Sequence, residues 1–422
     1  MSVTRTEPAA GYDSSQEATA NGQSHARDIP ARPGVFPVGY HQIHPDVSVN
    51  FQMNRWLTWM GPQSTSALEE MRSVAPRIRT YPDFVREFLG LAGRAETGGQ
   101  ISKQAYYLRA AEFFMFAGAP EKAAVRSQFI RLVRECNGIS DNEFELIPYD
   151  AGMLPSYQLA PEPSATHGTV VVHGGFDSYI EEWFPALLAL RDAGFRVIAF
   201  DGPGQGGALE DYGLTMNERW EKPVAAVLDH FKLEDVTLLG FSLGGGLAIR
   251  AAAFEPRVRR VIADDIMTDF ARVNLRRQGP AANVLMPGLV AVHARGALNA
   301  LLRAKMRSSL VAEWGICQGM HVQGAPTPAD YFEAVQRYAT LPISHLVRQD
   351  VLLMAGSEDH YVPLNQLPQQ LAALTGARSV SARLFTREEQ AQNHCQIGNI
   401  GLSLRVMIDW ISERTESVKS DV

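Results

Sequence analysis

The chain has 422 residues, of which 45% are hydrophobic and 20% are charged, and this composition is ordinary for one large globular domain with an accessory part. Its formal net charge of -7 argues against nucleic-acid binding, which requires basic residues clustered on one face. The N-terminus lacks the apolar stretch of a signal peptide, and no later segment offers about 18 uncharged apolar residues. We therefore expect no membrane span.

The cysteines indicate a reducing environment. Cys136, Cys317 and Cys395 are too few and too scattered for a disulfide framework or a zinc cluster. His, Asp and Glu show no recognisable metal-ligand spacing, so we expect no metal and no other cofactor. The sequence predicts a cytoplasmic protein.

The N-terminal third divides into a tail and a helical part. Residues 1–36 are rich in small and charged residues, so little burial would offset the entropy lost on ordering, and we expect a disordered tail. Across residues 37–140 apolar side chains recur at helical spacing, as Phe84, Phe88 and Leu91 do at i, i+4 and i+7. This pattern predicts a helical subdomain.

Residues 141–265 and 346–415 change to strand-like runs, the later of which are separated by helix-length segments. Uninterrupted apolar runs such as 169–172 and 236–239 are typical of a mostly parallel sheet covered on both faces. The fold class is therefore α/β. The predicted strands are FELIP, MLPSYQLA, TVVVH, RVIAF, VTLLG, VRRVIAD, VLLMAG and SVSARLF.

A helical stretch at 266–345 interrupts this α/β part. Its length of about 80 residues far exceeds the few residues of an ordinary connection. We expect it to form part of a lid or cap over the sheet, before the strand that carries the acid described below.

The segment Gly240-Phe-Ser-Leu-Gly244 places a G-x-S-x-G motif directly after an apolar strand and before a helical run. Glycines allow the tight strand-to-helix turn that lifts a serine above the sheet edge, and the helix N-terminus offers N–H groups to a developing oxyanion. A chance Gly-Ser-Gly turn is the alternative. The strand, the helix and the partners described below favour Ser242 as the nucleophile.

The predicted strand Thr169–His173 is followed by Gly174 and Gly175. A serine nucleophile on this kind of strand-to-helix turn takes its second oxyanion donor from a loop at this position. We expect the oxyanion hole to consist of the N–H of Leu243 with that of Gly175 or Phe176.

Several titratable residues surround this loop. His173 is expected to shape it rather than act as a base. Asp177, Glu181 and Glu182 follow, and such carboxylates usually cap the next helix or face solvent. Asp177 is the best placed of the three for an auxiliary catalytic role.

The acid and the base follow in the order that this arrangement requires, serine, then acid, then histidine. Asp359 comes after the strand-like run VLLMAG, with Glu358 as its competitor, and it is expected to hold the imidazole. His394 follows the last predicted strand and is expected to be the base. His360 is adjacent to the acid and is expected to point elsewhere.

The motifs HGGFDSYIEEW, GFSLGGG, GSEDHYVP and NHCQIGN resemble the α/β-hydrolases related to 2,6-dihydroxypseudooxynicotine hydrolase and to the fungal yellowish-green pigment hydrolases that shorten polyketides. The resemblance implies a hydrolase whose helical cap comes largely from the N-terminal subdomain. Proteins of that family are often dimeric, and some cleave a carbon–carbon bond beside a ketone. Ser242, Asp359 and His394 fall on that family's triad, and Asp177 falls near an acidic position that aids catalysis in some members.

The sequence leaves the reaction open between ester and β-diketone hydrolysis of a small carbonyl substrate, in secondary metabolism or aromatic catabolism. A non-hydrolytic cyclase or acyltransferase on the same scaffold is the alternative, and a binding protein would lack one of the triad residues. Aromatic and methionine side chains in the helical parts indicate an apolar substrate or plain core. These are Trp56, Trp59, Met60, Trp314 and Met320.

Overall fold

The computed structural model describes residues 36–161, 167–278 and 280–420. All but the last residue of the predicted tail lie outside this part of the chain. Within it, the helices lack the combination of length and hydropathy that a bilayer-spanning segment needs.

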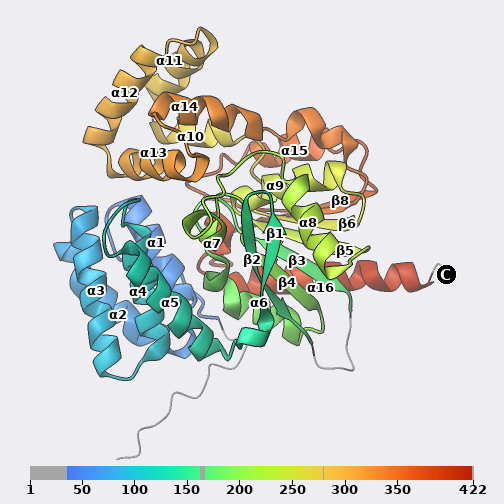
Figure 1. The fold of residues 1–422 in the computed structure, drawn as a ribbon, viewed down its shortest axis with the longest axis horizontal. Helices are drawn as coiled ribbons and strands as arrows, with labels where there is room; N and C mark the ends of the chain where they lie inside the picture. The colour runs from blue at the N-terminus through green and yellow to red at the C-terminus, as the bar shows by residue number, and fades with distance from the viewer. Residues whose placement is uncertain (1–35, 162–166, 279, 421–422) are drawn as a thin grey trace, which may run out of the picture.

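Eight strands form one sheet at the centre of the molecule (Figure 1). They occupy the eight segments predicted from the sequence, which confirms the α/β class. The pairings of β1 with β2 and of β2 with β4 are antiparallel, and the other pairings are parallel. In spatial order the strands are β1 (Phe144–Tyr149), β2 (Gly152–Leu159), β4 (Arg196–Phe200), β3 (Thr169–His173), β5 (Val236–Phe241), β6 (Val258–Asp264), β7 (Asp350–Gly356) and β8 (Ser379–Phe385).

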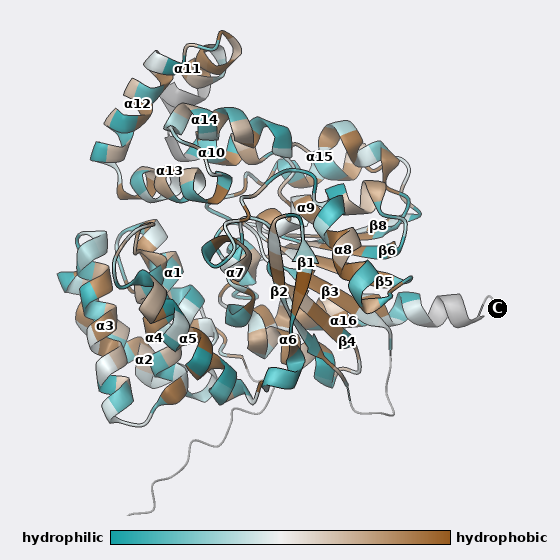
Figure 2. Cartoon of the chain, in the orientation of Figure 1, coloured by the Kyte–Doolittle hydropathy of each residue, from teal (hydrophilic) through white to brown (hydrophobic). Residues whose placement is uncertain are grey.

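Helices beside the sheet bury its apolar strands. All six residues of β5 are buried, as expected for a strand covered on both faces. In Figure 2 the strands are mainly hydrophobic, whereas hydrophilic residues gather on the helices. The flanking helices are α6 (Phe184–Asp192), α7 (Gly206–Glu210), α8 (Glu221–Phe231), α9 (Leu243–Phe254), α15 (Gln366–Ala373) and α16 (Ile400–Ser420).

Five α-helices of the described residues precede the sheet in sequence and lie to one side of it (Figure 1). In α3 the predicted apolar stripe of Phe84, Phe88 and Leu91 is fully buried. Thr80 and Asp83 begin this helix with a reciprocal capping box, which satisfies otherwise unpaired N–H groups. The five helices are α1 (Val47–Thr58), α2 (Ser64–Val74), α3 (Tyr81–Thr97), α4 (Ile101–Phe113) and α5 (Lys122–Asn137).

A second helical group separates β6 from β7 and lies next to the first (Figure 1). Trp314 of α13 stacks on Phe113 of α4, with ring centroids 4.7 Å apart, and its indole N–H donates to the Phe113 carbonyl at 3.1 Å. The two groups therefore contact each other directly. The helices of this second group are α10 (Phe270–Gln278), α11 (Pro280–Ala291), α12 (Arg295–Ser308), α13 (Leu310–Gln323) and α14 (Pro328–Ala334).

Candidate active site

Ser242 occupies a sharp turn between β5 and α9. Its φ of 61° lies in the left-handed region, and its backbone N–H donates to the Asp264 carbonyl at 2.6 Å. A methyl group on Gly244 would lie 2.5 Å from the Gly174 carbonyl oxygen, so only glycine allows this close approach. The turn therefore presents a partly exposed serine at the carboxyl end of a central strand.

The structure brings the three predicted triad residues together. His394, at the start of a 3₁₀ turn (His394–Gln396), has its Nε2 2.8 Å from Ser242 Oγ. Its Nδ1 lies 2.6 Å from Asp359 Oδ2. An ionised carboxylate can only accept a hydrogen bond, so Nδ1 carries the proton and Nε2 is free to accept from the serine hydroxyl.

The ion pair between the acid and the base changes the pKa of both. Burial alone would lower the pKa of His394, but the carboxylate of Asp359 raises it well above the ordinary 6.5. Burial conversely favours a neutral Asp359, and the facing imidazole outweighs it and holds the pKa of Asp359 below its usual value. Asp359 is therefore a stable anion behind the histidine.

The predicted oxyanion loop lies against this serine. A methyl group on Gly175 would be 2.7 Å from the Phe241 carbonyl oxygen and 2.8 Å from the Leu243 nitrogen. The amide of Gln205 donates to the carbonyls of Gly174 and Gly175 at 2.7 and 2.9 Å, which fixes the loop. Leu243 begins α9, where backbone N–H groups lack intrahelical partners.

His173 lies beneath this loop and is fully buried. Its Nδ1 lies 2.9 Å from the Gly174 carbonyl, and burial lowers its pKa to about 4. The imidazole is therefore neutral at physiological pH, and its Nδ1–H donates to the loop. Its hydrogen bond goes to Gly174 and not to Ser242.

A cavity opens beside Ser242 and His394. Its aromatic residues come from separate parts of the chain, and no local sequence pattern joins them. Five large side chains were considered as substrate contacts or plain core. Three of them are buried in the core: Trp56, Trp59 and Met60. The residues around this cavity are Phe51, Gln52, Arg55, Phe176, Asp177, Ser178, Trp183, Ser242, Phe270, Val273, Tyr361, His394, Cys395 and Ile397.

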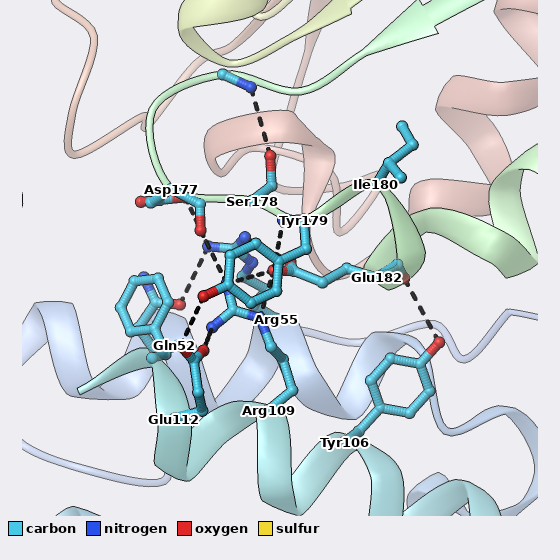
Figure 3. A network of polar contacts seen from close by, with 12 residues as sticks. Gln52, Arg55, Tyr106, Arg109, Glu112, Asp177, Ser178, Tyr179, Ile180 and Glu182 are labelled. Atoms are coloured by element: carbon cyan, nitrogen blue, oxygen red, sulfur yellow. Dashed lines mark hydrogen bonds and ion pairs between the residues drawn. The ribbon is translucent and has the colours of Figure 1, made fainter. Parts of the chain in front are cut away.

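Buried ion pairs tie the oxyanion loop to the N-terminal helices (Figure 3). Glu182 caps a short 3₁₀ helix (Ile180–Trp183), as carboxylates after such a loop were expected to do, by accepting the Tyr179 N–H at 3.1 Å. The same carboxylate is fully buried between Arg55 of α1 and Arg109 of α4, at 2.6 Å from an N–H donor of each. The sequence analysis missed this second role.

Asp177 has one side in this network and one side in the cavity. Arg55 donates to its carboxylate at 3.0 Å, and Arg109 donates to its backbone carbonyl at 2.8 Å. Its side chain keeps 23% of its surface exposed, in contrast to Glu182. Asp177 is thus held by Arg55, and its carboxylate remains accessible from the cavity.

Asp265 is a further residue at the site that the sequence analysis missed. Its Oδ2 lies 3.1 Å from His394 Nδ1, and the ligand atoms of Asp265, His394 and Cys395 lie within 4.8 Å of one another. Burial raises the pKa of the Cys395 thiol to about 12, which leaves it a poor metal ligand. We therefore interpret the cluster as part of the hydrogen-bonding surroundings of His394 and not as a metal site.

The fold and the arrangement of Ser242, His394 and Asp359 are those of an α/β-hydrolase. Residues 169–394 match the family described as alpha/beta hydrolase fold, and the chain belongs to it. Together with the relatives described next, this match confirms the resemblance predicted from the motifs.

Several hydrolases are similar to the chain in sequence. Hydrolase LUC6 of a Fusarium species is 26% identical over 88% of this chain and 98% of its own length. The 20-hydroxy-prefusarin hydrolase FUS2 of Gibberella moniliformis is 28% identical over 65% of this chain and 70% of its own. The 2,6-dihydropseudooxynicotine hydrolase of Paenarthrobacter nicotinovorans is 37% identical, over 26% of this chain and 31% of its own. The chain is therefore an enzyme of the hydrolase class.

Solved structures share the fold. The 2,6-dihydroxy-pseudo-oxynicotine hydrolase has a TM-score of 0.54 at 20% identity, covering 80% of this chain and 88% of that protein. Wild-type AbyA5 has a TM-score of 0.61 at 17% identity, covering 85% and 95%. At these identities the likeness supports the fold alone.

Proposed function

We propose that the protein is a serine hydrolase that cleaves the bond next to a substrate carbonyl through an acyl-enzyme at Ser242. The observation that carries this proposal is the continuous chain of contacts from Ser242 Oγ to His394 to Asp359, at 2.8 and 2.6 Å, at the edge of a cavity. An activated nucleophile needs a base within hydrogen-bond reach and a third group that orients this base.

In the proposed reaction His394 Nε2 takes the hydroxyl proton as Ser242 Oγ attacks the carbonyl carbon. The oxyanion is stabilised by the N–H of Leu243 with that of Gly175 or Phe176, because donors fixed in advance need no reorganisation. The protonated His394 then gives its proton to the leaving group. Water, deprotonated by the same imidazole, finally hydrolyses the acyl-enzyme.

We infer that the substrate is a small, largely apolar β-diketone, such as a polyketide chain, or an ester. Support comes from the aromatic side chains around the cavity and from relatives named as hydrolases of 20-hydroxy-prefusarin and of 2,6-dihydropseudooxynicotine. In a β-diketone the electron pair of the broken carbon–carbon bond leaves as an enolate, which needs a proton from His394. We assign Asp177 to holding a polar group of the substrate during this step.

In this proposal the helices α1–α5 and α10–α14 together form the cap. The cavity takes Phe51 and Arg55 from the first group and Phe270 and Val273 from the second. These residues would select the substrate and exclude bulk water.

A fluorophosphonate should label Ser242, and the Ser242→Ala variant should remain unlabelled, as read by peptide mass spectrometry. Turnover of aryl esters and of β-diketones in ¹⁸O-labelled water then separates the reactions. Hydrolysis places one ¹⁸O in the carboxylic acid product, whereas a cyclase or acyltransferase leaves the product unlabelled. Labelling at another residue, or none in the folded protein, would contradict the proposed nucleophile.

The kcat/KM of the enzyme should fall as the pH falls through the pKa of His394, because the base acts only when Nε2 carries no proton. Burial lowers this pKa, but the facing groups, led by the carboxylate of Asp359 and including Asp265, raise it well above 6.5. We therefore expect the acidic limb of the kcat/KM profile to be centred above pH 6.5. A limb centred below pH 6.5 in folded enzyme would contradict this assignment.

A further inference from the structure

Two carboxylates face the same nitrogen of the imidazole of His394. Asp359 Oδ2 lies 2.6 Å and Asp265 Oδ2 lies 3.1 Å from Nδ1. Asp265 directly follows β6 and Asp359 follows β7, and these neighbouring strands are parallel, so their carboxyl ends meet at one edge of the sheet. A serine–histidine–acid triad requires only one such carboxylate.

Hydrogen bonds hold Asp265 in this position. Its Oδ2 accepts the backbone N–H of Cys395, and its Oδ1 accepts the side-chain amide of Gln396, both at 2.8 Å. Both donors lie on the same short turn as His394. The carboxylate is 1% exposed, so it stays within reach of Nδ1 without competition from solvent.

Two buried carboxylates that share one N–H repel each other, and they remain together only if a proton or a cation lies between them. Burial raises the pKa of Asp265, and the charge of Asp359 contributes in the same direction. Both oxygens of Asp265 accept hydrogen bonds, which favours its ionised form and leaves the Nδ1 proton between two carboxylates. When His394 accepts the serine proton, the resulting imidazolium faces two negative charges.

We propose that Asp265 is a second positioning residue for the base, which shares the Nδ1 proton of His394 with Asp359 and replaces Asp359 as acceptor when that carboxylate is lost. This inference rests on the proposed role of His394 in catalysis. Its consequence is that neither acid is by itself indispensable, whereas the pair is.

A purely structural role for Asp265 makes different predictions. Cys395 and Gln396 both have a φ of 48°, in the left-handed region, and Asp265 could serve only to hold this turn. Loss of a hydrogen bond from Gln396 would then have the same effect as loss of the carboxylate charge. Gln396→Met removes the bond to Oδ1, while the backbone N–H of Cys395 still holds Oδ2 beside His394 Nδ1, which makes it the matched control.

The test compares Asp265→Asn, Asp359→Asn, the double variant and Gln396→Met, with kcat and KM measured on an aryl ester and folding checked by thermal denaturation. A single-acid triad loses about 10⁴-fold in kcat when its acid becomes an amide. We expect about a 10²-fold loss for Asp359→Asn, about 10-fold for Asp265→Asn and about 10⁴-fold for the double variant, at nearly constant KM. Gln396→Met should stay within about threefold of the wild type, since its change leaves both charges in place.

The low-field proton NMR signal of His394 Nδ1–H gives a second readout, assigned by its absence in His394→Ala. It should persist, shifted, in each single variant and disappear in the double variant. The inference is overturned if Asp359→Asn already loses the signal and is as inactive as the double variant, or if Gln396→Met is as impaired as Asp265→Asn. Because the NMR signal needs no turnover, it tests the shared proton even if Ser242 fails to react with a fluorophosphonate.

Discussion

Replacing His394 by alanine should lower kcat by roughly 10⁴- to 10⁶-fold, because the nucleophile loses its base and the leaving group loses its proton donor together. His394 is the group that contacts both Ser242 Oγ and the two acids. KM should change little, since the imidazole acts on the reacting atoms rather than on the remainder of the substrate. Steady-state kinetics on an aryl ester, with circular dichroism to verify the fold, measures this effect.

His360 supplies the matched control for this prediction. It lies next to Asp359 in the chain, but its ring packs against Phe51 with centroids 4.7 Å apart and is not among the residues around the cavity at Ser242. His360→Ala should therefore keep kcat within about tenfold of the wild type, as expected for a packing change beside a site. Comparable losses in the two variants would show that imidazole chemistry at His394 is not the cause.

The strands, and the contact of Ser242 and Asp359 with His394, could be predicted largely because most of their signals are local. An apolar run of five to seven residues marks a strand in a covered sheet, and Gly240 and Gly244 around Ser242 mark the turn after it. The order of serine, acid and histidine then limits the remaining choices to the ends of later strands. Apart from this order, each signal depends on residues that are close together in the chain.

The second acid and the buried ion pairs could not be predicted in this way. Asp265 lies 129 positions before His394, and only the parallel pairing of β6 with β7 brings it to the imidazole. A doubled aspartate at the carboxyl end of a predicted strand was the available signal. Glu182 gave no signal of its partners, because Arg55 and Arg109 come from helices whose packing the sequence does not specify.

The aromatic residues illustrate the same limit. Trp56 of α1 and Trp59 directly after it were candidates for substrate contact, but both are buried in the core. Phe51, which is also in α1, lines the cavity. Periodicity indicates that a helix has a buried face. It does not distinguish a face buried against the protein from one buried against a ligand.

The variant Glu182→Gln should lower the free energy of unfolding by about 3 to 5 kcal/mol, the usual cost of removing one partner from a buried ion pair. Glu182 is fully buried and neutralises the guanidinium groups of Arg55 and Arg109, which are themselves almost completely buried. With a neutral amide in its place, two buried cations lose the carboxylate they share. Urea denaturation followed by fluorescence measures the change.

The neighbouring Glu181 provides a control of the same size and burial. Burial raises the pKa of Glu181, and its side chain accepts a hydrogen bond from Tyr157 at 3.0 Å instead of pairing with an arginine. Glu181→Gln should therefore cost about 1 kcal/mol or less, since an amide oxygen can still accept the Tyr157 hydroxyl. Equal destabilisation of the two variants would mean that the cost comes from burying an amide and not from the loss of charge. Because Arg55 also holds Asp177, we expect Glu182→Gln to reduce kcat as well, which would link the stability of the N-terminal helices to the geometry of the oxyanion loop.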